Sequence, residues 1–132
     1  MAIRVVRLGE PRAPHEGVRL GTVRRPPRGV RKAEFARRDY YDVWLPELSP
    51  TAELLSWALA SPWTEARWRR FSREYRRQMA DAAPRHLIAT LAALSTTSSF
   101  SVGCYCADAE RCHRALLGEL LAEAGAMMDS RA

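Results

Sequence analysis

Four short stretches of the chain are rich in apolar residues, many of them β-branched or aromatic, which is typical of β-strands. These stretches lie at residues 3–8, 18–23, 43–45 and 100–105. The last one alternates most strictly, with Phe100, Val102 and Cys104 on the same side. It therefore predicts a strand with one strongly apolar face.

Between these stretches the apolar residues recur at helical spacing. Ser favours the N-cap and Pro the first helical position, so Ser49-Pro50 and Ser61-Pro62 predict two helix starts. Pro84 opens a third helix. A fourth helix is expected to have Asp108 as its cap and to end near Gly125.

The second of these helices carries an apolar stripe at spacings of three and four residues. Its members are Trp68, Phe71, Tyr75 and Met79. Most of the neighbouring arginines lie outside the stripe, on the expected solvent-exposed face of the helix. An aromatic stripe beside arginines could stack on nucleic-acid bases, but core packing is the favoured interpretation.

Strands separated by helices favour an α/β fold with at least some parallel pairing. We expect residues 1–132 to form a single compact domain, with a small, mostly parallel sheet flanked by helices. Its core would span about residues 3–125, followed by a short C-terminal tail. No apolar run approaches the ~20 residues of a membrane span, so no membrane association is expected.

The net charge of the chain indicates which partners it could bind, and its cysteines indicate the cellular compartment. The net charge is +6, and residues 1–38 form a basic arm with eleven basic and three acidic residues. Such an arm could bind nucleic acid or a small anion. The three cysteines are crowded together rather than spread as a disulfide framework, so we expect free thiols and a cytoplasmic protein. Arg4 and Arg7 argue against a signal peptide.

Residues 104–114 concentrate the unusual side chains, at a junction of strand and helix where α/β proteins bind ligands. Their spacing fits no familiar zinc motif, so no metal is expected. Cys106 and Arg111 have rhodanese-like spacing, but Asp108 and Glu110 would repel an anion there. Cys112, near the helix N-terminus, is a candidate reactive thiol, and either other cysteine could resolve it. Alternatively, the cysteines are only small core residues.

The pattern of residues 104–114 resembles the DUF488 family, and the whole chain resembles its YeaO-like branch. Members have Cys-x-Glu-x-Asp, three residues, then Cys-His-Arg. The matching residues are Cys104, Asp108, Cys112, His113 and Arg114. Cys106 stands where the family usually has the glutamate.

The N-terminal half carries a second motif of this family, in an arginine-rich loop. The retained residues are Gly17, Arg19, Arg24, Pro27, Arg28, Gly29 and Lys32. Val23 and Pro26 replace the usual aspartate and tryptophan. The resemblance implies a compact α/β domain over about residues 3–125 and implies no reaction, because the family is of unknown function.

The leading expectation is a cytoplasmic domain that binds a small anionic ligand, phosphate-like or nucleotide-like, where loop 24–29 meets loop 104–114. The expected ligand-binding residues are Arg24, Arg28, Cys104, Asp108 and Arg114, with His113 and Cys112 as candidate catalytic residues. One alternative is a thiol-dependent enzyme or redox sensor using Cys112. Others are a nucleic-acid-binding module that uses the basic arm, and a structural module without chemistry. No cofactor or oligomeric state follows from the sequence.

Overall fold

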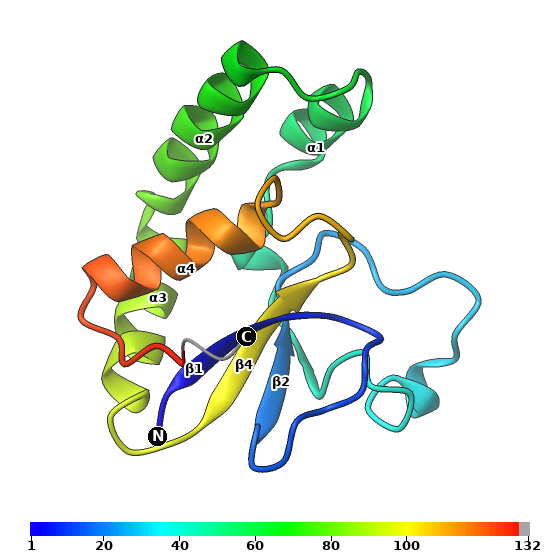
Figure 1. The fold of residues 1–132 in the computed structure, drawn as a ribbon, viewed down its shortest axis with the longest axis vertical. Coiled ribbons are helices and arrows are strands. Elements are labelled where there is room, and N and C mark those ends of the chain that lie inside the picture. Colours follow the sequence, from blue (N-terminus) through cyan, green and yellow to red (C-terminus); the bar gives the residue numbers. More distant parts are fainter. Residues whose placement is uncertain (130–132) are drawn as a thin grey trace.

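The computed structural model describes residues 1–129, which form a four-stranded, all-parallel sheet with helices packed beside it (Figure 1). The strands are β1 (Ile3–Arg7), β2 (Val18–Gly21), β3 (Val43–Trp44) and β4 (Phe100–Cys104). Their order in the sheet is β1-β4-β2-β3. The expected α/β class is confirmed, and the parallel pairing is complete rather than partial.

The helices follow the apolar periodicity of the sequence. They are α1 (Ala52–Leu59), α2 (Glu65–Met79), α3 (Ala82–Leu94) and α4 (His113–Glu123), with two 3-10 turns, η1 (Lys32–Glu34) and η2 (Pro46–Leu48). In residues 1–129 no helix is long and apolar enough to cross a membrane.

The helix starts predicted from serine-proline pairs were wrong by two or three residues. The N-cap of α1 is Thr51 and that of α2 is Thr64, and each threonine hydroxyl accepts a hydrogen bond from a backbone N–H three residues on. The helix α3 has Asp81 as N-cap, three residues before the proline expected to open it. A threonine at each of the first two starts satisfies an otherwise unpaired donor, which the preceding proline cannot do.

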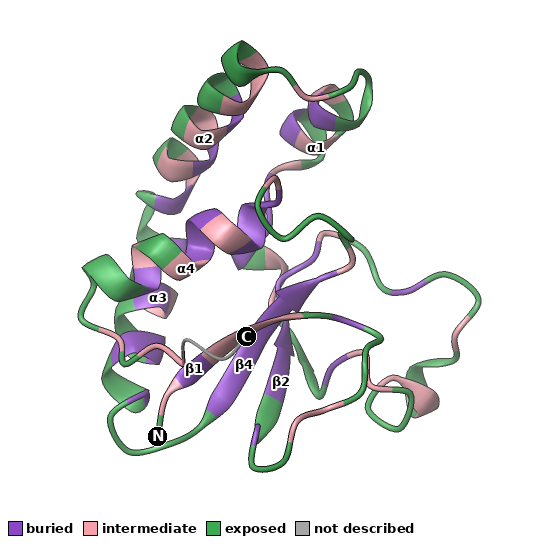
Figure 2. Ribbon diagram, viewed as in Figure 1, coloured by how far each residue is buried: buried purple, intermediate pink, exposed green. Residues whose placement is uncertain are grey.

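One face of the sheet carries the main hydrophobic core. Phe100 and Val102 of β4 are buried there together with the α2 stripe residues Phe71, Tyr75 and Met79. Figure 2 shows β4 buried along its whole length, as expected for a central strand. The expectation that the aromatic stripe belongs to the core is confirmed, with Trp68 partly buried at its end.

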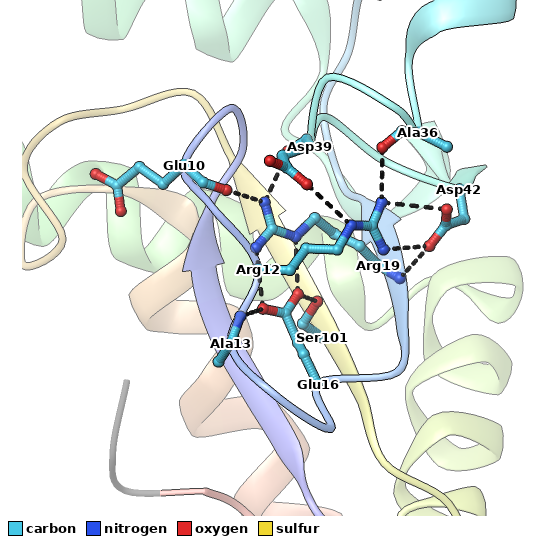
Figure 3. A network of polar contacts seen from close by, with 9 residues as sticks. All are labelled: Glu10, Arg12, Ala13, Glu16, Arg19, Ala36, Asp39, Asp42 and Ser101. Carbon is cyan, nitrogen blue, oxygen red and sulfur yellow. Dashed lines mark hydrogen bonds and ion pairs between the residues drawn. The ribbon is translucent and has the colours of Figure 1, made fainter.

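The other face of the sheet is covered by irregular segments and contains a buried ion pair (Figure 3). The Arg19 guanidinium donates to both carboxylate oxygens of Glu16, at 2.7 and 3.0 Å, and also to the carbonyls of Glu10 and Asp39. Ser101 of β4 donates to Glu16 at 2.6 Å. The network therefore fastens segments 8–17 and 35–42 onto β2 and β4.

Candidate functional site

The candidate site lies at the carboxyl ends of β2 and β4, which are neighbours in the sheet. Beyond β4 the chain runs through residues 105–111 into α4, and beyond β2 it enters the arginine-rich loop. In parallel sheets ligands bind at this edge, because the loops that follow adjacent strands converge there.

The sulfurs of Cys104, Cys106 and Cys112 form a thiol cluster, in which the three Sγ atoms lie within 4.8 Å of one another. Cys104 and Cys112 are buried with their sulfurs 2.7 Å apart, and Cys106 is exposed. Cys104 comes from the end of β4, Cys106 from the following loop, and Cys112 is the N-cap of α4. All three are free thiols.

Charge in the thiol cluster favours a single thiolate, on Cys106. Hydrogen bonds from the thiols of Cys104 and Cys112 lower the pKa of Cys106, and the positive charge of the nearby Arg114 lowers it further. The same hydrogen bonds, together with burial, raise the pKa of Cys112. The pKa of Cys104 is also raised, chiefly by its hydrogen bond with Cys106.

His113 is buried at the start of α4, with its ring fixed by the backbone of the neighbouring strand. Its Nε2 lies 2.6 Å from the carbonyl oxygen of Thr22, which can only accept, so Nε2 carries the proton. Burial lowers the pKa of His113 despite this hydrogen bond, which favours the neutral ring. The unprotonated Nδ1 then lies 3.8 Å from the Cys112 sulfur.

Arg114 and Asp108, both expected to bind ligand, hold the loop between β4 and α4. The buried Arg114 donates from Nη1 to the carbonyl of Cys106 at 2.9 Å and to that of Cys104 at 3.4 Å. Asp108 accepts from the backbone N–H groups of Glu110 and Arg111. The N-cap of α4 is Cys112, so the prediction that Asp108 caps this helix was wrong.

A pocket of about 530 Å³ lies between the two motif loops and the helix α1. From the loops its lining includes Arg24, Arg28, Cys104, Cys106 and His113. Arg114 lines a separate cavity of about 460 Å³ beside β1. Asp108 and Cys112 line neither of these two cavities. Four of the seven expected site residues thus share one pocket.

Arginines form one wall of this pocket. The Arg24 guanidinium is half-buried and donates to the carbonyl oxygens of Pro50 at 3.0 Å and Ser49 at 3.4 Å, so it ties the loop to the start of α1. Arg25 and Arg28 are exposed. Two exposed guanidinium groups are therefore available at the rim of the pocket.

The remaining walls come from residues that the sequence did not single out. Tyr105 donates from its hydroxyl to the carbonyl of Arg25 at 2.9 Å and so links the two loops. Tyr40, Leu55 and Leu59 add apolar surface. Tyr105 could have been noticed, because it alternates with the buried residues of β4. The leucines of α1 carry no such signal, because only tertiary packing brings this helix to the pocket.

Comparison with known proteins confirms the family expected from the two motifs. A family model described as DUF488-N3a, "Active DUF488-N3 subclade", matches residues 3–125, a range that includes both motif loops. No curated protein matches the chain, and no solved structure matches it.

Proposed function

The chain belongs to the DUF488 family, in its DUF488-N3a subclade, and we propose that it binds a small anionic ligand between its two motif loops. One observation carries this proposal. Residues far apart in the sequence, Arg24 and Arg28 on one side and Cys104, Cys106 and His113 on the other, line the same pocket.

The arginines supply the recognition of the anion. A guanidinium group makes short, charge-assisted and often bidentate hydrogen bonds to phosphate or carboxylate. Arg25 and Arg28 are exposed at the rim and can turn toward a ligand, while Arg24 is held by its carbonyl partners. We therefore assign direct anion contacts to Arg28 first, and to Arg24 the role of shaping the loop.

The apolar walls narrow the class of ligand. Leu55, Leu59 and Tyr40 face the same pocket as the arginines. A bare inorganic anion would leave these side chains in contact with water. An anion joined to an apolar or aromatic group would bury them and gain hydrophobic free energy. The favoured ligand thus carries its anionic group on an organic ring or chain.

Phenyl phosphate and inorganic phosphate are suitable probes for isothermal titration calorimetry. We expect phenyl phosphate to bind more tightly than phosphate, and Arg28→Gln to weaken it by about tenfold, the effect of losing one charge-assisted interaction of about 1.5 kcal/mol. Arg31→Gln is the matched control, because Arg31 is exposed in the same segment and outside the pocket. Equal losses in both variants would indicate nonspecific attraction and contradict the proposal.

The exposed Cys106 supports a second candidate, a thiol-dependent enzyme acting on the bound anion. Cys106 is in the pocket lining, and the sulfurs of the buried Cys104 and Cys112 lie within 4.8 Å of its sulfur. This arrangement favours Cys106 over Cys112 as the attacking thiol. The description of the family as an active subclade agrees with an enzymatic role.

Brief alkylation followed by peptide mass spectrometry tests this second candidate. In the folded protein iodoacetamide should modify Cys106 well before the two buried cysteines. In urea the three should react at similar rates, which controls for local sequence effects. If Cys112 is modified as fast as Cys106 in the folded protein, the assignment of Cys106 fails.

A further inference from the structure

We propose that the thiol cluster is a binding site for one soft metal ion, of the Zn²⁺ or Cu⁺ class, with Cys104, Cys106 and Cys112 as its ligands. Thiolate sulfur is the ligand type that selects such ions over hard cations. The proposal is independent of anion binding, since it does not require the pocket arginines Arg24, Arg25 and Arg28.

The size of the cluster suits such an ion. A zinc–thiolate bond is about 2.3 Å long, so two thiolates on one tetrahedral ion lie about 3.8 Å apart. The three sulfurs already fall within 4.8 Å of one another. The buried pair Cys104 and Cys112, at 2.7 Å, would have to separate by about 1 Å on this geometry. Cys106 lies on an exposed loop that can adjust.

His113 provides an independent observation that points to a metal. A histidine that ligates a metal with one nitrogen usually donates its other N–H to a carbonyl or carboxylate, which fixes the ring and the tautomer. The Nε2–H of His113 is bound in this way to the Thr22 carbonyl, and Nδ1 is on the side of the Cys112 sulfur. Nδ1 lies outside the set of ligand atoms that fall within 4.8 Å of one another. It would become the fourth ligand of Zn²⁺ only if the ring and the sulfurs moved closer together, whereas Cu⁺ is satisfied by three sulfurs.

The surroundings compensate the charge of the ligands. On binding, each S–H releases its proton to solvent and no electrons are transferred. Arg114 is buried under the cluster, with Nη1 3.8 Å from the Cys104 sulfur. The N-terminus of α4, an eleven-residue helix, begins directly after Cys112 and adds a partial positive charge. The positive charge of Arg114 and of the helix N-terminus therefore stabilises the net negative charge of three thiolates around one cation.

Metal titration of the chelator-treated, reduced full chain tests the proposal. We expect one Cd²⁺, used as a spectroscopic probe, to bind per chain with the sulfur-to-metal absorption of three thiolates. Cys106→Ser should lose about a third of that absorption and bind at least about tenfold more weakly. Ala107→Ser is the matched control on the same exposed loop and should behave as wild type. Competition with chromophoric chelators for Zn²⁺ and for Cu⁺ then identifies the preferred ion.

Two results would overturn the metal site. One is that none of the three ions withstands a competing chelator. The other is that Cys106→Ser, shown to be folded by circular dichroism, binds with the absorption and affinity of wild type. Binding of phenyl phosphate to the metal-free chain is measured separately, so failure of the metal site is distinguishable from failure of the anion pocket.

Discussion

At the scale of single residues, Gly17 shows how closely two backbones approach just before the paired strands β2 and β4 begin. Its φ is +82°, and a Cβ built there would lie 2.0 Å from the carbonyl oxygen of Ser99. Gly125 also has a positive φ, +95°, but a Cβ there would meet no atom within 4 Å. A side chain would have a similar conformational cost at both positions, but only at Gly17 would it also collide with a neighbouring atom.

We therefore expect Gly17→Ala to be far more harmful than Gly125→Ala. The conformational cost alone is about 1–3 kcal/mol, and at Gly17 the collision with a carbonyl adds to it. Urea unfolding of both variants measures the difference in the free energy of unfolding. Similar losses in the two variants would show that the backbone at Gly17 moves aside without cost.

The buried pair Arg19 and Glu16 provides a second comparison between residues. Arg19→Met leaves the Glu16 carboxylate buried without its partner, so a loss of about 3–5 kcal/mol in the free energy of unfolding is expected. Arg37→Met breaks the exposed pair with Glu34 instead, and should change stability by at most about 1 kcal/mol. Comparable losses from the two substitutions, measured by urea unfolding, would contradict this account.

The sequence indicated where the thiol cluster lies, but not how its side chains are arranged. The unusual composition of residues 104–114 located the thiol cluster, because cysteine, histidine and arginine rarely gather by chance at a strand–helix junction. It could not show that Arg114 points beneath the loop while Cys106 remains exposed. Which side chain is buried and which is exposed depends on the residue at which β4 ends and on how α4 is rotated about its axis. Both are set by tertiary packing.

At the scale of elements, the capping threonines carry a testable share of helix stability. The Thr64 hydroxyl accepts from the N–H of Arg67 at 3.1 Å, whereas Asp81, the N-cap of α3, makes no side-chain cap hydrogen bond. We expect Thr64→Ala to cost about 1 kcal/mol and Asp81→Ala about half as much, through loss of its charge near the helix N-terminus. Thermal unfolding of the two variants should rank them in this order, and the reverse order would count against the capping role.

The sequence predicted which helices and main strands form, but not the residues at which they begin and end. The period-two pattern of residues 100–104 corresponds directly to β4, since a buried central strand has a clear apolar face. The edge strand β3 is only two residues long and exposed, so its apolar run could barely be distinguished from a loop. The pairs Ser49-Pro50 and Ser61-Pro62 resembled helix starts but precede the threonines that cap α1 and α2.

At the scale of the whole molecule, buried carboxylates make stability depend on pH. Burial alone would raise the pKa of Glu16, but hydrogen bonds from Arg19 and Ser101 lower it to about 2, from an ordinary value of 4.5. A lowered folded-state pKa stabilises the fold above pH 4.5, and this stabilisation is lost as the pH falls toward 2. Hydrogen bonds from Arg12 lower the pKa of Asp42 in the same direction, against the effect of burial.

We therefore expect the free energy of unfolding to fall by about 2–3 kcal/mol through the Glu16 carboxylate alone between about pH 5 and pH 2. Urea unfolding across this range measures the loss. Glu16→Gln removes the titrating group, so its stability, although lower at neutral pH, should depend less steeply on pH. Parallel curves for the variant and the wild type would exclude Glu16 as the source.

The positive charge of the molecule is also partly engaged in internal contacts. Arg12 and Arg19 of the basic arm pair with Asp39, Asp42 and Glu16. Composition counts these arginines as available for nucleic acid, because a sequence does not reveal which charges are paired. The arginines at the pocket rim, Arg25 and Arg28, are exposed members of the arm that line the same pocket as Cys104 and Cys106.

The strand order has a consequence for folding kinetics. β1 and β2 both pair with β4 and not with each other, so the sheet cannot form until residues 100–104 are available. During synthesis the apolar faces of α1, α2 and α3 leave the ribosome before that strand does. Closing β1 onto β4 also joins residues 97 positions apart, such as Ile3 and Phe100, and such non-local pairing slows folding. The nascent chain should therefore be prone to aggregation and to capture by chaperones until β4 has emerged.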